Sequence, residues 1–347
     1  MPSEGRTLLL DARQVAALVE LPDAIAAVES AFRAQGLGQT PSPAILGYPV
    51  SGGGFHVKAA ALSSPTRFTV KLNSNFPENG HRFGLPTIQG TITLFDGVTG
   101  FPLAVMDSIE ITILRTAAAT AVAAKWLARQ DAATITICGC GAQARAQLAA
   151  VASVRLIQRA FLYDIDRRRA ENLADEVHSP GLEALPAGDL RAALRESEVC
   201  VTCTPSTEPF LRIGDVAPGT FVAAVGADSP EKQELEPRLV ASATVVVDHL
   251  EQCATIGELH HALAAGLMTG DDVHAELGKI VCGERPGRSS TDEIIVFDST
   301  GTALQDAALS GLVYERAVER GVGTEFDFAR KGRVTTAADP DSGGGRP

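Results

Sequence analysis

The sequence predicts an α/β protein in which a doubly wound parallel sheet follows a smaller, β-rich α+β region. From about Ala133 onward, β-branched strand segments alternate with helical segments, beginning with ATITICG and AQARAQLAAV. Further strands are predicted at RAFLYD, EVCVTCT, TFVAAVG, ATVVVD and EIIVFDS. Strands separated by helices of this length form a parallel sheet with helices on both faces. A glycine-rich turn between the first strand and its helix fits the same architecture.

The preceding residues predict a mixed region. Asp11 is a suitable cap for a helix over residues 12–19, and Pro22 suits the first turn of a second helix that runs to Gly36. The segments FHVKAA and FTVKLNSNF are predicted as strands, and TITLFDGVTGFPLAVMD as a hairpin around residues 96–100. RTAAATAVAAKWLARQ predicts an alanine-rich helix that opens near Arg115.

Composition excludes several classes of protein. With 347 residues the chain is long enough for two domains, and its formal net charge of −12, without a long basic run, argues against a nucleic-acid partner. The sequence contains no run of about 18 uncharged apolar residues, so no membrane span is predicted. The start lacks the pattern of a signal peptide, so a cytoplasmic protein without a membrane partner is expected.

Six cysteines in a chain of this size do not indicate a disulfide scaffold. Cys138 and Cys140 form a CxC, and Cys200 and Cys203 form a CxxC, so zinc is an alternative. Both pairs lie in predicted buried strands, where cysteine behaves as a small apolar residue. The histidines do not form a convincing metal set, and no metal site is predicted; the positions considered are His249, His260, His261 and His274.

The turn GCGAQA predicts a dinucleotide site. Gly139, Gly141 and Ala144 have the spacing G-x-G-x-x-G/A, between a strand and a helix. The first glycine permits the tight turn, and the second lets a pyrophosphate approach the backbone at the helix amino terminus. Asp164 ends the next strand, 25 positions after Gly139 (164 minus 139), close to the roughly 20 expected for an acid that binds a ribose 2′-hydroxyl.

Asp164 favours NAD, because a carboxylate repels the 2′-phosphate of NADP. Arg167 and Arg168 lie just beyond it and would accept that phosphate if the aspartate turned away. NAD is therefore the predicted cofactor, with NADP as the alternative.

Six segments resemble the ornithine cyclodeaminase and mu-crystallin family: VKLNSNFP, ILRTAAATAVAAKWLA, ICGCGAQARAQ, VTCTPST, AVGADSPEKQEL and VFDSTGTALQD. The resemblance implies a substrate-binding and dimerisation domain over residues 1–114, completed by residues 303–330. A Rossmann domain over residues 115–302 would bind the cofactor, and residues 331–347 are predicted to be a disordered tail. The resemblance also implies a homodimer and NAD(P)-dependent chemistry at the α-carbon of an amino or imino acid.

The resemblance assigns roles to individual residues. Lys71 and Asp228 would be catalytic, and Arg115 would clamp the substrate carboxylate, a role that suits its planar fork. Lys71 or Asp228 would protonate or hydrogen-bond an imine nitrogen. The implied cofactor contacts are Arg115, Thr116, Gly139, Gly141, Ala142, Gln143, Asp164, Arg167, Thr204, Val225, Asp228, Ser299, Thr300 and Gly301. The simpler alternatives are a helix cap for Asp228 and a surface ion pair for Arg115.

Three positions depart from the cyclodeaminase pattern. Ala44 stands where an arginine is expected, and His56 and Lys58 replace a glutamate and a methionine on the next strand. Residues two apart share a face of a strand, and FTVKLNSN is the expected antiparallel partner, with Lys71 and Asn73 on one face. His56, Lys58, Lys71, Asn73 and Arg115 are therefore predicted to line one cationic wall that binds a substrate with one or two carboxylates. The cost of burying cations alone supports an anionic ligand; solvent exposure of His56 or Lys58 is the alternative.

Three functions are consistent with these residues. The first is an imine reductase or amino acid dehydrogenase that acts on a small amino or imino acid. The second is an ornithine cyclodeaminase, which forms proline and ammonia and uses NAD catalytically. The third is a non-catalytic binding protein similar to mu-crystallin. The predicted set of Lys71, Arg115 and Asp228 favours the first two, and the departures from the cyclodeaminase pattern favour the first.

Overall fold

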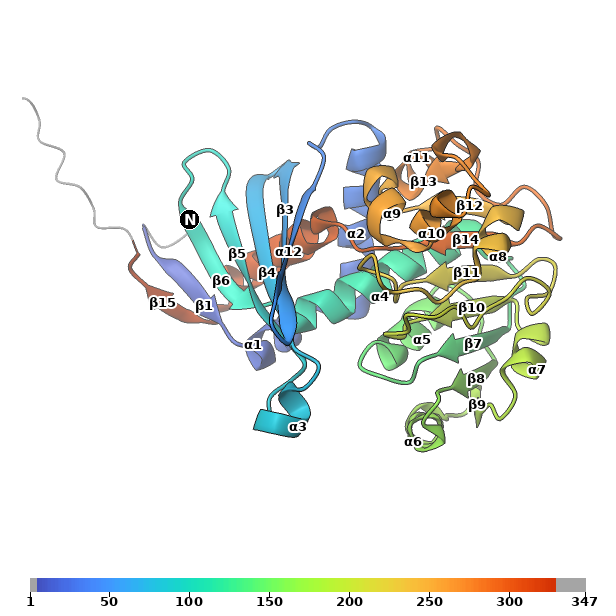
Figure 1. Ribbon diagram of the computed structural model, residues 1–347. Helices are drawn as coiled ribbons and strands as arrows, with labels where there is room; N and C mark the ends of the chain where they lie inside the picture. The colour runs from blue at the N-terminus through green and yellow to red at the C-terminus, as the bar shows by residue number, and fades with distance from the viewer. Residues whose placement is uncertain (1–4, 329–347) are drawn as a thin grey trace, which may run out of the picture.

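A computed structural model describes residues 5–328, and the predicted tail over residues 331–347 lies outside them. Figure 1 shows two β-sheets side by side, with helices α4 and α12 running between them. The strands are β1 (Thr7–Leu10), β2 (Ala44–Val50), β3 (Gly53–Ser63), β4 (Thr66–Asn75), β5 (Ile88–Asp96), β6 (Pro102–Asp107), β7 (Thr134–Cys138), β8 (Arg159–Tyr163), β9 (Glu183–Pro186), β10 (Val199–Thr202), β11 (Phe221–Ala224), β12 (Thr244–Val247), β13 (Ala275–Glu276), β14 (Ile295–Asp298) and β15 (Thr324–Phe326).

Twelve α-helices are assigned within residues 5–328: α1 (Ala12–Leu18), α2 (Leu21–Gly36), α3 (Asn79–Phe83), α4 (Ile109–Leu127), α5 (Ala144–Ala152), α6 (Arg167–Val177), α7 (Leu190–Arg195), α8 (Pro237–Ser242), α9 (Leu250–Ile256), α10 (Glu258–Ala264), α11 (Leu277–Val281) and α12 (Ala303–Arg320). The predicted cap of the first helix is confirmed, because Asp11 accepts a hydrogen bond from the backbone N–H of Gln14. Among the described helices, none is long and apolar enough to cross a membrane, and the expected cytoplasmic location stays a prediction.

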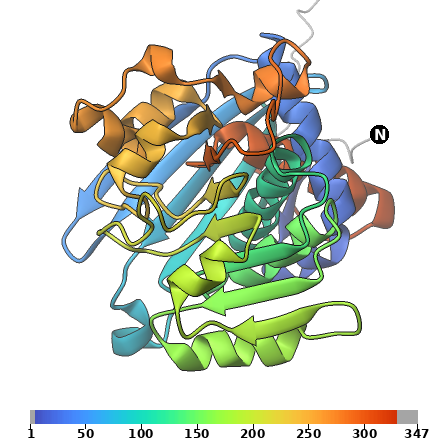
Figure 2. The same cartoon turned by 90° about the vertical axis from the view of Figure 1, so that its right-hand side faces the viewer.

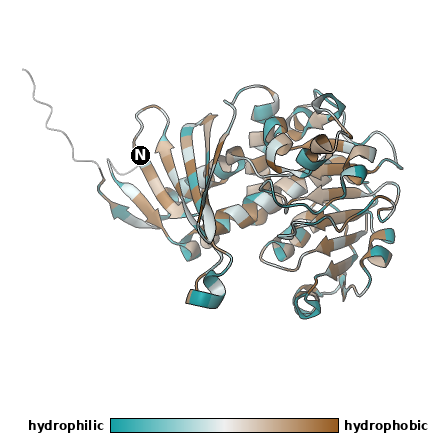
Figure 3. Cartoon of the chain, viewed as in Figure 1, coloured by the Kyte–Doolittle hydropathy of each residue, from teal (hydrophilic) through white to brown (hydrophobic). Residues whose placement is uncertain are grey.

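The eight-stranded sheet is parallel throughout, as predicted, in the order β13-β12-β14-β11-β10-β7-β8-β9. The chain runs outward from β7 through β8 to β9 and then returns to place β10 on the other side of β7. The strand order therefore reverses between β7 and β10, and ligands of open α/β sheets bind at such a point. Figure 2 shows this sheet after a 90° turn about the vertical axis, and Figure 3 colours its central strands as hydrophobic.

The seven-stranded sheet has the order β15-β1-β6-β5-β4-β3-β2 and is mixed, because β1 pairs parallel with β6. The predicted pairing of β3 with β4 is confirmed, and it sets His56 opposite Asn73 and Lys58 opposite Lys71. The predicted hairpin is also confirmed, since β5 ends at Asp96 and β6 begins at Pro102. Helix α12 packs against β3, β4 and β5, so the end of the chain returns to cover this sheet.

The alanine-rich helix begins earlier than predicted, at Ile109 and not near Arg115. The carboxylate of Asp107 accepts hydrogen bonds from the backbone N–H groups of Ile109 and Glu110 and so satisfies two donors of the first turn. Arg115 therefore lies in the second turn, on a helix whose remaining length is largely buried. A helix apolar on all sides belongs in a core, and α4 packs against both α2 and α5.

Candidate active site

The two predicted lysines lie side by side on adjacent strands. Lys58 on β3 is opposite Lys71 on β4, and both side chains are buried. His56, two residues before Lys58, is half-buried on the same face, opposite Asn73. The Asn73 side-chain oxygen accepts a hydrogen bond from Ser108 Oγ at 2.6 Å, which ties this wall to the start of α4.

An aspartate that sequence reasoning missed joins Lys71 to Arg115. Asp306 on α12 is fully buried, and both of its carboxylate oxygens approach Lys71 Nζ, at 2.9 and 2.8 Å. Arg115 Nε lies 3.2 Å from Asp306 Oδ1. Arg115 is thus buried beside a carboxylate, and the surface ion pair considered from the sequence is wrong. The only sequence signal for Asp306 was its place in the motif STGTALQD, which assigned it no role.

The guanidinium of Arg115 is fixed at more than one point. Its Nη1 donates to Gln305 Oε1 at 3.0 Å, so consecutive residues of α12 hold Arg115. Gly301 leaves room for it: the glycine has a φ of +75°, and a Cβ there would lie 2.1 Å from Arg115 Nη1. Among the described residues, Arg115 Nη2 takes part in no hydrogen bond, and so it stays available to a ligand carboxylate.

Lys58 is buried, so the alternative of an exposed ammonium is wrong. Its ammonium donates to the backbone carbonyls of Thr300 and Gly301, at 3.0 and 2.7 Å. The turn that contains them, predicted as a cofactor contact, is held from its other side by Asp248. This buried carboxylate accepts bonds from Thr300 Oγ1 and Gly301 N, and from Ser299 Oγ at 3.4 Å.

Asp248 follows β12 at the carboxyl edge of the sheet, and sequence reasoning assigned it no role, although it considered Asp164 and Asp228 at the ends of other strands. Gln252 on α9 also binds the turn: its Nε2 donates to Thr300 Oγ1 at 2.8 Å and to the carbonyl of Gly301 at 3.2 Å. The turn from Ser299 to Gly301 is therefore fixed by side chains from both halves of the molecule.

The glycine turn lies at the carboxyl ends of β7 and β10. Gly139 has a φ of +94°, and a Cβ there would lie 2.8 Å from the Thr204 side chain, so only glycine fits. Nothing lies within 4 Å of a Cβ built on Gly141, which leaves the backbone open to a ligand. Helix α5 begins three residues later at buried Ala144, with its amino terminus at the turn.

Asp164 is anchored beside this turn. Its Oδ2 accepts from the backbone N–H of Cys140 at 2.8 Å, and its Oδ1 from that of Asp166 at 2.9 Å. Arg167, the suggested 2′-phosphate ligand, instead bonds Glu171 on the next turn of α6 at 2.8 Å. The two hydrogen bonds hold the aspartate in place, so the sequence alternative in which it turns away would require breaking both.

The other predicted cofactor residues lie along the same edge or beside it. Ala142 and Gln143 lie in the glycine turn, and Gln143 precedes α5. Val225 follows β11, and its N–H donates to the carbonyl of Thr202. Thr116 is buried on α4, with its hydroxyl donating to the carbonyl of Thr112 at 2.7 Å.

Glu234 is a buried carboxylate whose only sequence signal was its place in the segment AVGADSPEKQEL, which assigned it no role. It accepts from the N–H and hydroxyl of Thr204, from Thr202 Oγ1 and from the N–H of Gly226. These four bonds, between 2.6 and 2.9 Å, join the loops that follow β10 and β11. Glu258 accepts in turn from the N–H groups of Glu234 and Leu235, which fixes the segment that carries Glu234.

Asp228 lies beyond β11 with a half-exposed side chain, 2.6 Å from Lys232 Nζ. No described helix begins there, since α8 begins at Pro237, so the helix-cap alternative is wrong. Partial desolvation opposes ionisation of Asp228, but the positive charges of Lys232 and Lys58 outweigh it and lower the pKa of the carboxyl. Burial also lowers the pKa of His56, against an opposing effect of Asp228.

The ammonium of Lys71 is strongly perturbed by its surroundings. Burial lowers its pKa to about 7; Asp306 opposes this, and the positive charges of Arg115 and Lys58 add to it. The pKa of Lys58 is also lowered by burial and by Arg115. An ammonium with a pKa near neutrality can give up or accept a proton, as acid–base chemistry requires.

The buried cations have an anion within the protein, contrary to the expectation from the sequence, because Asp306 pairs with both Lys71 and Arg115. A dianionic substrate is therefore not required to offset their charge. The positive charge that Asp306 does not offset suits a substrate with one carboxylate.

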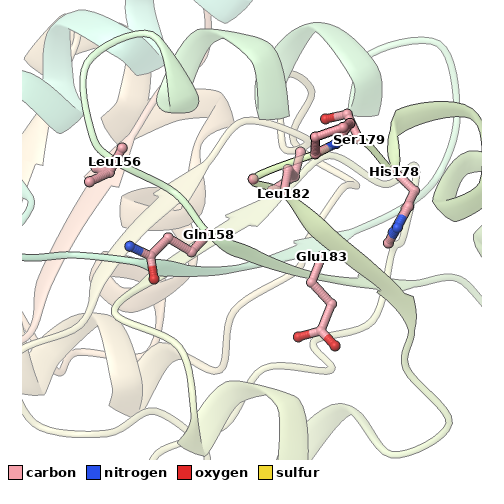
Figure 4. A pocket seen from close by; sticks show the side chains of 8 residues that line it. Leu156, Gln158, His178, Ser179, Leu182 and Glu183 are labelled. Carbon is pink, nitrogen blue, oxygen red and sulfur yellow. The ribbon is translucent and has the colours of Figure 1, made fainter.

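A hollow of about 680 Å³ lies elsewhere, lined by Leu156, Gln158, His178, Ser179, Leu182 and Glu183, among others (Figure 4). Gln158 precedes β8 and Glu183 begins β9, so the hollow is at the amino ends of the strands. The glycine turn and the Ser299–Gly301 turn lie at the carboxyl ends. The hollow is therefore not part of the candidate site.

The comparisons with known proteins agree with this architecture. The model of the ornithine cyclodeaminase/mu-crystallin family matches residues 6–321. Alanine dehydrogenase of Archaeoglobus fulgidus is 37% identical over 93% of this chain and 99% of its own. The structure of Thermococcus litoralis Δ1-pyrroline-2-carboxylate reductase, with NADH and L-proline, has a TM-score of 0.86 and 34% identity over 92% and 99% of the two chains. Lysine cyclodeaminase, which recognises L-lysine, L-ornithine and L-2,4-diaminobutyric acid, has a TM-score of 0.81 and 32% identity over 93% and 96%.

Proposed function

The chain belongs to the ornithine cyclodeaminase/mu-crystallin family, and we propose that it is an NAD-dependent oxidoreductase acting on the C–N bond at the α-carbon of an imino or amino acid. The observation that carries this proposal is the cluster of Lys71, Arg115 and Asp306 beside the Ser299–Gly301 turn. A carboxylate-binding cation and a titratable ammonium thus lie at the edge of the sheet that bears the glycine turn.

The residues at that edge fit a dinucleotide. Gly139 and Gly141 expose backbone at the amino terminus of α5, which favours a pyrophosphate. Asp164, held by two backbone N–H groups, suits a ribose 2′-hydroxyl and disfavours NADP. Thr204, Val225 and the Ser299–Gly301 turn would border the rest of the cofactor. NAD, when bound, supplies or accepts the hydride.

The protein's own groups orient the substrate and move its proton. Arg115 Nη1 and Nη2 would bind the substrate carboxylate and so fix the α-carbon. Lys71, with a pKa of about 7, would hold a proton near the substrate nitrogen in reduction and accept one in oxidation. Asp228, which stays ionised at neutral pH, would stabilise a positively charged imine. His56 and Asn73 would border the substrate side chain.

The substrate class we propose is a small imino or amino acid with one α-carboxylate. Asp306 already offsets part of the charge of Lys71 and Arg115, and Lys58 gives two of its three N–H donors to backbone carbonyls. A cyclic imine of the pyrroline type or the imine of pyruvate has the single negative charge that this balance favours.

An assay with NADH and a panel of imines tests the proposed function. The panel contains pyrroline-2-carboxylate, piperideine-2-carboxylate, and pyruvate or oxaloacetate with ammonia. Consumption of NADH with a monocarboxylate imine is the expected result. Absence of turnover with every imine, and with the corresponding amino acids and NAD, would contradict the proposal.

Substitution of the two cations tests their roles. We expect Lys71→Ala and Arg115→Ala to lower kcat/KM by at least about 100-fold, because each loses a charge-assisted contact with the substrate. NADH binding, followed by fluorescence titration, should change little in Lys71→Ala. Lys125→Ala serves as the matched control, since this lysine forms a half-exposed pair with Glu29 on the protein surface. Wild-type kcat/KM in either site variant would end the assignment.

Ornithine cyclodeaminase activity is the second candidate, supported by the similarity to lysine cyclodeaminase over nearly the whole chain. Incubation with L-ornithine and a catalytic amount of NAD separates the two functions. Ammonia and proline formed in equal amounts, without accumulated NADH, would favour the cyclodeaminase. His56 and Lys58, where cyclodeaminases carry glutamate and methionine, favour the reductase.

We also propose a homodimer formed through the outer face of the seven-stranded sheet. On the side opposite Lys58 and Lys71, the sheet exposes apolar side chains: Leu46, Tyr48, Phe68 and Leu72. A contiguous apolar patch of this kind is typical of a protein–protein interface. The alanine dehydrogenase relative forms a dimer with bound NAD. In this arrangement residues 1–114 and the last helix form the substrate-binding and dimerisation domain, and residues 115–302 form the cofactor domain.

A further inference from the structure

We propose that Asp306 is a positioning residue that keeps Lys71 in its charged form and fixes the guanidinium of Arg115 for the substrate. This inference rests on the proposed function, since it concerns how the substrate-binding cations are held. It adds a residue of the last helix to the two cations proposed to act on the substrate, Lys71 on β4 and Arg115 on α4.

The contacts of Asp306 are those of a bridge between two cations. Its oxygens lie 2.8 and 2.9 Å from Lys71 Nζ, and one of them lies 3.2 Å from Arg115 Nε. The three side chains are almost fully buried. Water therefore screens their charges little, and removal of the carboxylate would leave two like charges close together.

Asp306 opposes the other influences on Lys71. Desolvation, Arg115 on α4 and Lys58 on β3 all disfavour the ammonium, and Asp306 on α12 is the anion that stabilises it. Burial alone would raise the pKa of Asp306, but Lys71 and Arg115 outweigh it and lower that pKa. Thr112 Oγ1, 3.5 Å from Lys71 Nζ, is uncharged and does not change this balance.

The position of Asp306 on α12 explains how one residue reaches both cations. Helix α12 leaves the eight-stranded sheet after the Ser299–Gly301 turn and crosses to the face of β3 and β4. Its first turn thus meets Lys71 on β4, while Gln305 beside it accepts from Arg115. The two halves of the candidate site are joined by one rigid element, and Asp306 lies where they meet.

The test compares the pH dependence of kcat/KM for imine reduction in the wild type and in Asp306→Asn. Reduction requires the Lys71 ammonium, so the wild-type rate should fall as the pH rises through about 7. Loss of the carboxylate lowers the Lys71 pKa, and this limb should move about 1 to 3 pH units lower in the variant. If a folded variant that binds NADH loses kcat/KM at the same pH as the wild type, the proposal is overturned.

Gln305→Ala is the matched control for this experiment. Gln305 precedes Asp306 on the same helix and touches Arg115 but not Lys71 in the described contacts. We expect a KM for the imine that rises about tenfold with an unchanged pH limb, because only a hydrogen bond to a charged group is lost. An equal shift of the limb in this control would mean that any disturbance of the helix moves it, and the proposal would fail.

A second measurement does not depend on turnover. The chain has six lysines, so 13Cε-labelled lysine gives few NMR signals, and the Lys71 signal is assigned by its loss in Lys71→Arg. The wild-type signal should titrate near pH 7, and that of Asp306→Asn at lower pH. If no imine is reduced but this shift is seen, the proposed function fails while the role of Asp306 stands. An unshifted signal would refute that role whatever the activity.

If Asp306→Asn does not fold, the double variant Lys71→Met with Asp306→Asn decides the question. Removal of the uncompensated ammonium should then restore folding and NADH binding, because the two side chains act as a pair. A double variant that is no better folded than Asp306→Asn would show that the carboxylate has another structural role, and it would contradict the proposal.

Discussion

At the scale of single residues, buried carboxylates organise the candidate site. Asp306 joins Lys71 to Arg115, Asp248 holds the Ser299–Gly301 turn, and Glu234 joins the loops after β10 and β11. Each accepts hydrogen bonds from groups that would otherwise be unpaired in the interior. The residues proposed to contact ligands are therefore held in place by buried acids that are not themselves proposed to contact a ligand.

We also propose that one carboxylate, that of Asp164, sets the choice between NAD and NADP. We expect Asp164→Ser to raise the KM for NADH about tenfold and to lower that for NADPH, because a charged hydrogen bond to the ribose is lost and a repulsion is removed. Steady-state kinetics with both cofactors checks this. Asp166→Ser is the control: it removes a nearby acid but keeps a side chain able to cap α6. An unchanged cofactor preference in Asp164→Ser would show that another group sets it.

At the scale of elements, the Ser299–Gly301 turn connects the two sheets. It follows β14 of the parallel sheet and leads into α12, which covers the mixed sheet. Lys58 of β3 and Gln252 of α9 both bond the carbonyl of Gly301. The turn is thus held from both halves, and the bond to Lys58 ties β3 of the mixed sheet to the parallel sheet.

Substitution of the glycine tests this turn. Gly301→Ala should lower the free energy of unfolding and raise the KM for the imine, because its Cβ would meet Arg115 Nη1. The matched control is Gly266→Ala, which has a similar φ of +67° but nothing within 4 Å of the added atom. In the control, the free energy of unfolding should fall by only about 1 kcal/mol, which is the cost of placing a Cβ on a left-handed backbone. If urea unfolding gives the same loss of unfolding free energy for both variants, and Gly301→Ala leaves KM unchanged, the close approach to Arg115 is unimportant.

At the scale of the whole molecule, the mixed sheet has two faces of different composition. One face bears Lys58 and Lys71 and packs against α12, and the other exposes Leu46, Tyr48 and Leu72. An exposed apolar sheet face favours association, and the proposed dimer would bury it. The catalytic cations and the dimer interface would then lie on opposite sides of the same strands.

A charge on the outer face tests the proposed dimer. We expect Leu72→Asp to convert the dimer into a monomer, because a carboxylate would be buried without a partner at the interface. Light scattering after size-exclusion chromatography measures the mass. Leu156→Asp is the control: this exposed leucine borders the hollow at the far edge of the parallel sheet and should leave the mass unchanged. A wild-type monomer, or a dimer that tolerates Leu72→Asp, would contradict the proposed interface.

Local patterns in the chain were sufficient to predict the parallel sheet, the glycine turn and the pairing of β3 with β4. Each depends on neighbouring residues: β-branched runs, the spacing of Gly139 and Gly141, and the alternation that sets Lys58 and Lys71 on one face. The helix boundary was less accurate, because the carboxylate of Asp107 starts α4 at Ile109, six residues before Arg115 (115 minus 109).

Only the tertiary structure revealed the partners of the cations. Asp306 is 235 positions from Lys71 in the chain, and Lys58 is 242 positions from Thr300, so no local pattern relates them. The fold brings α12 back across β3 and β4 and buries the three charges of Lys71, Arg115 and Asp306 together. The sequence reveals which residues carry charge, whereas their ionisation and partners depend on desolvation and distance, which exist only once the chain is folded.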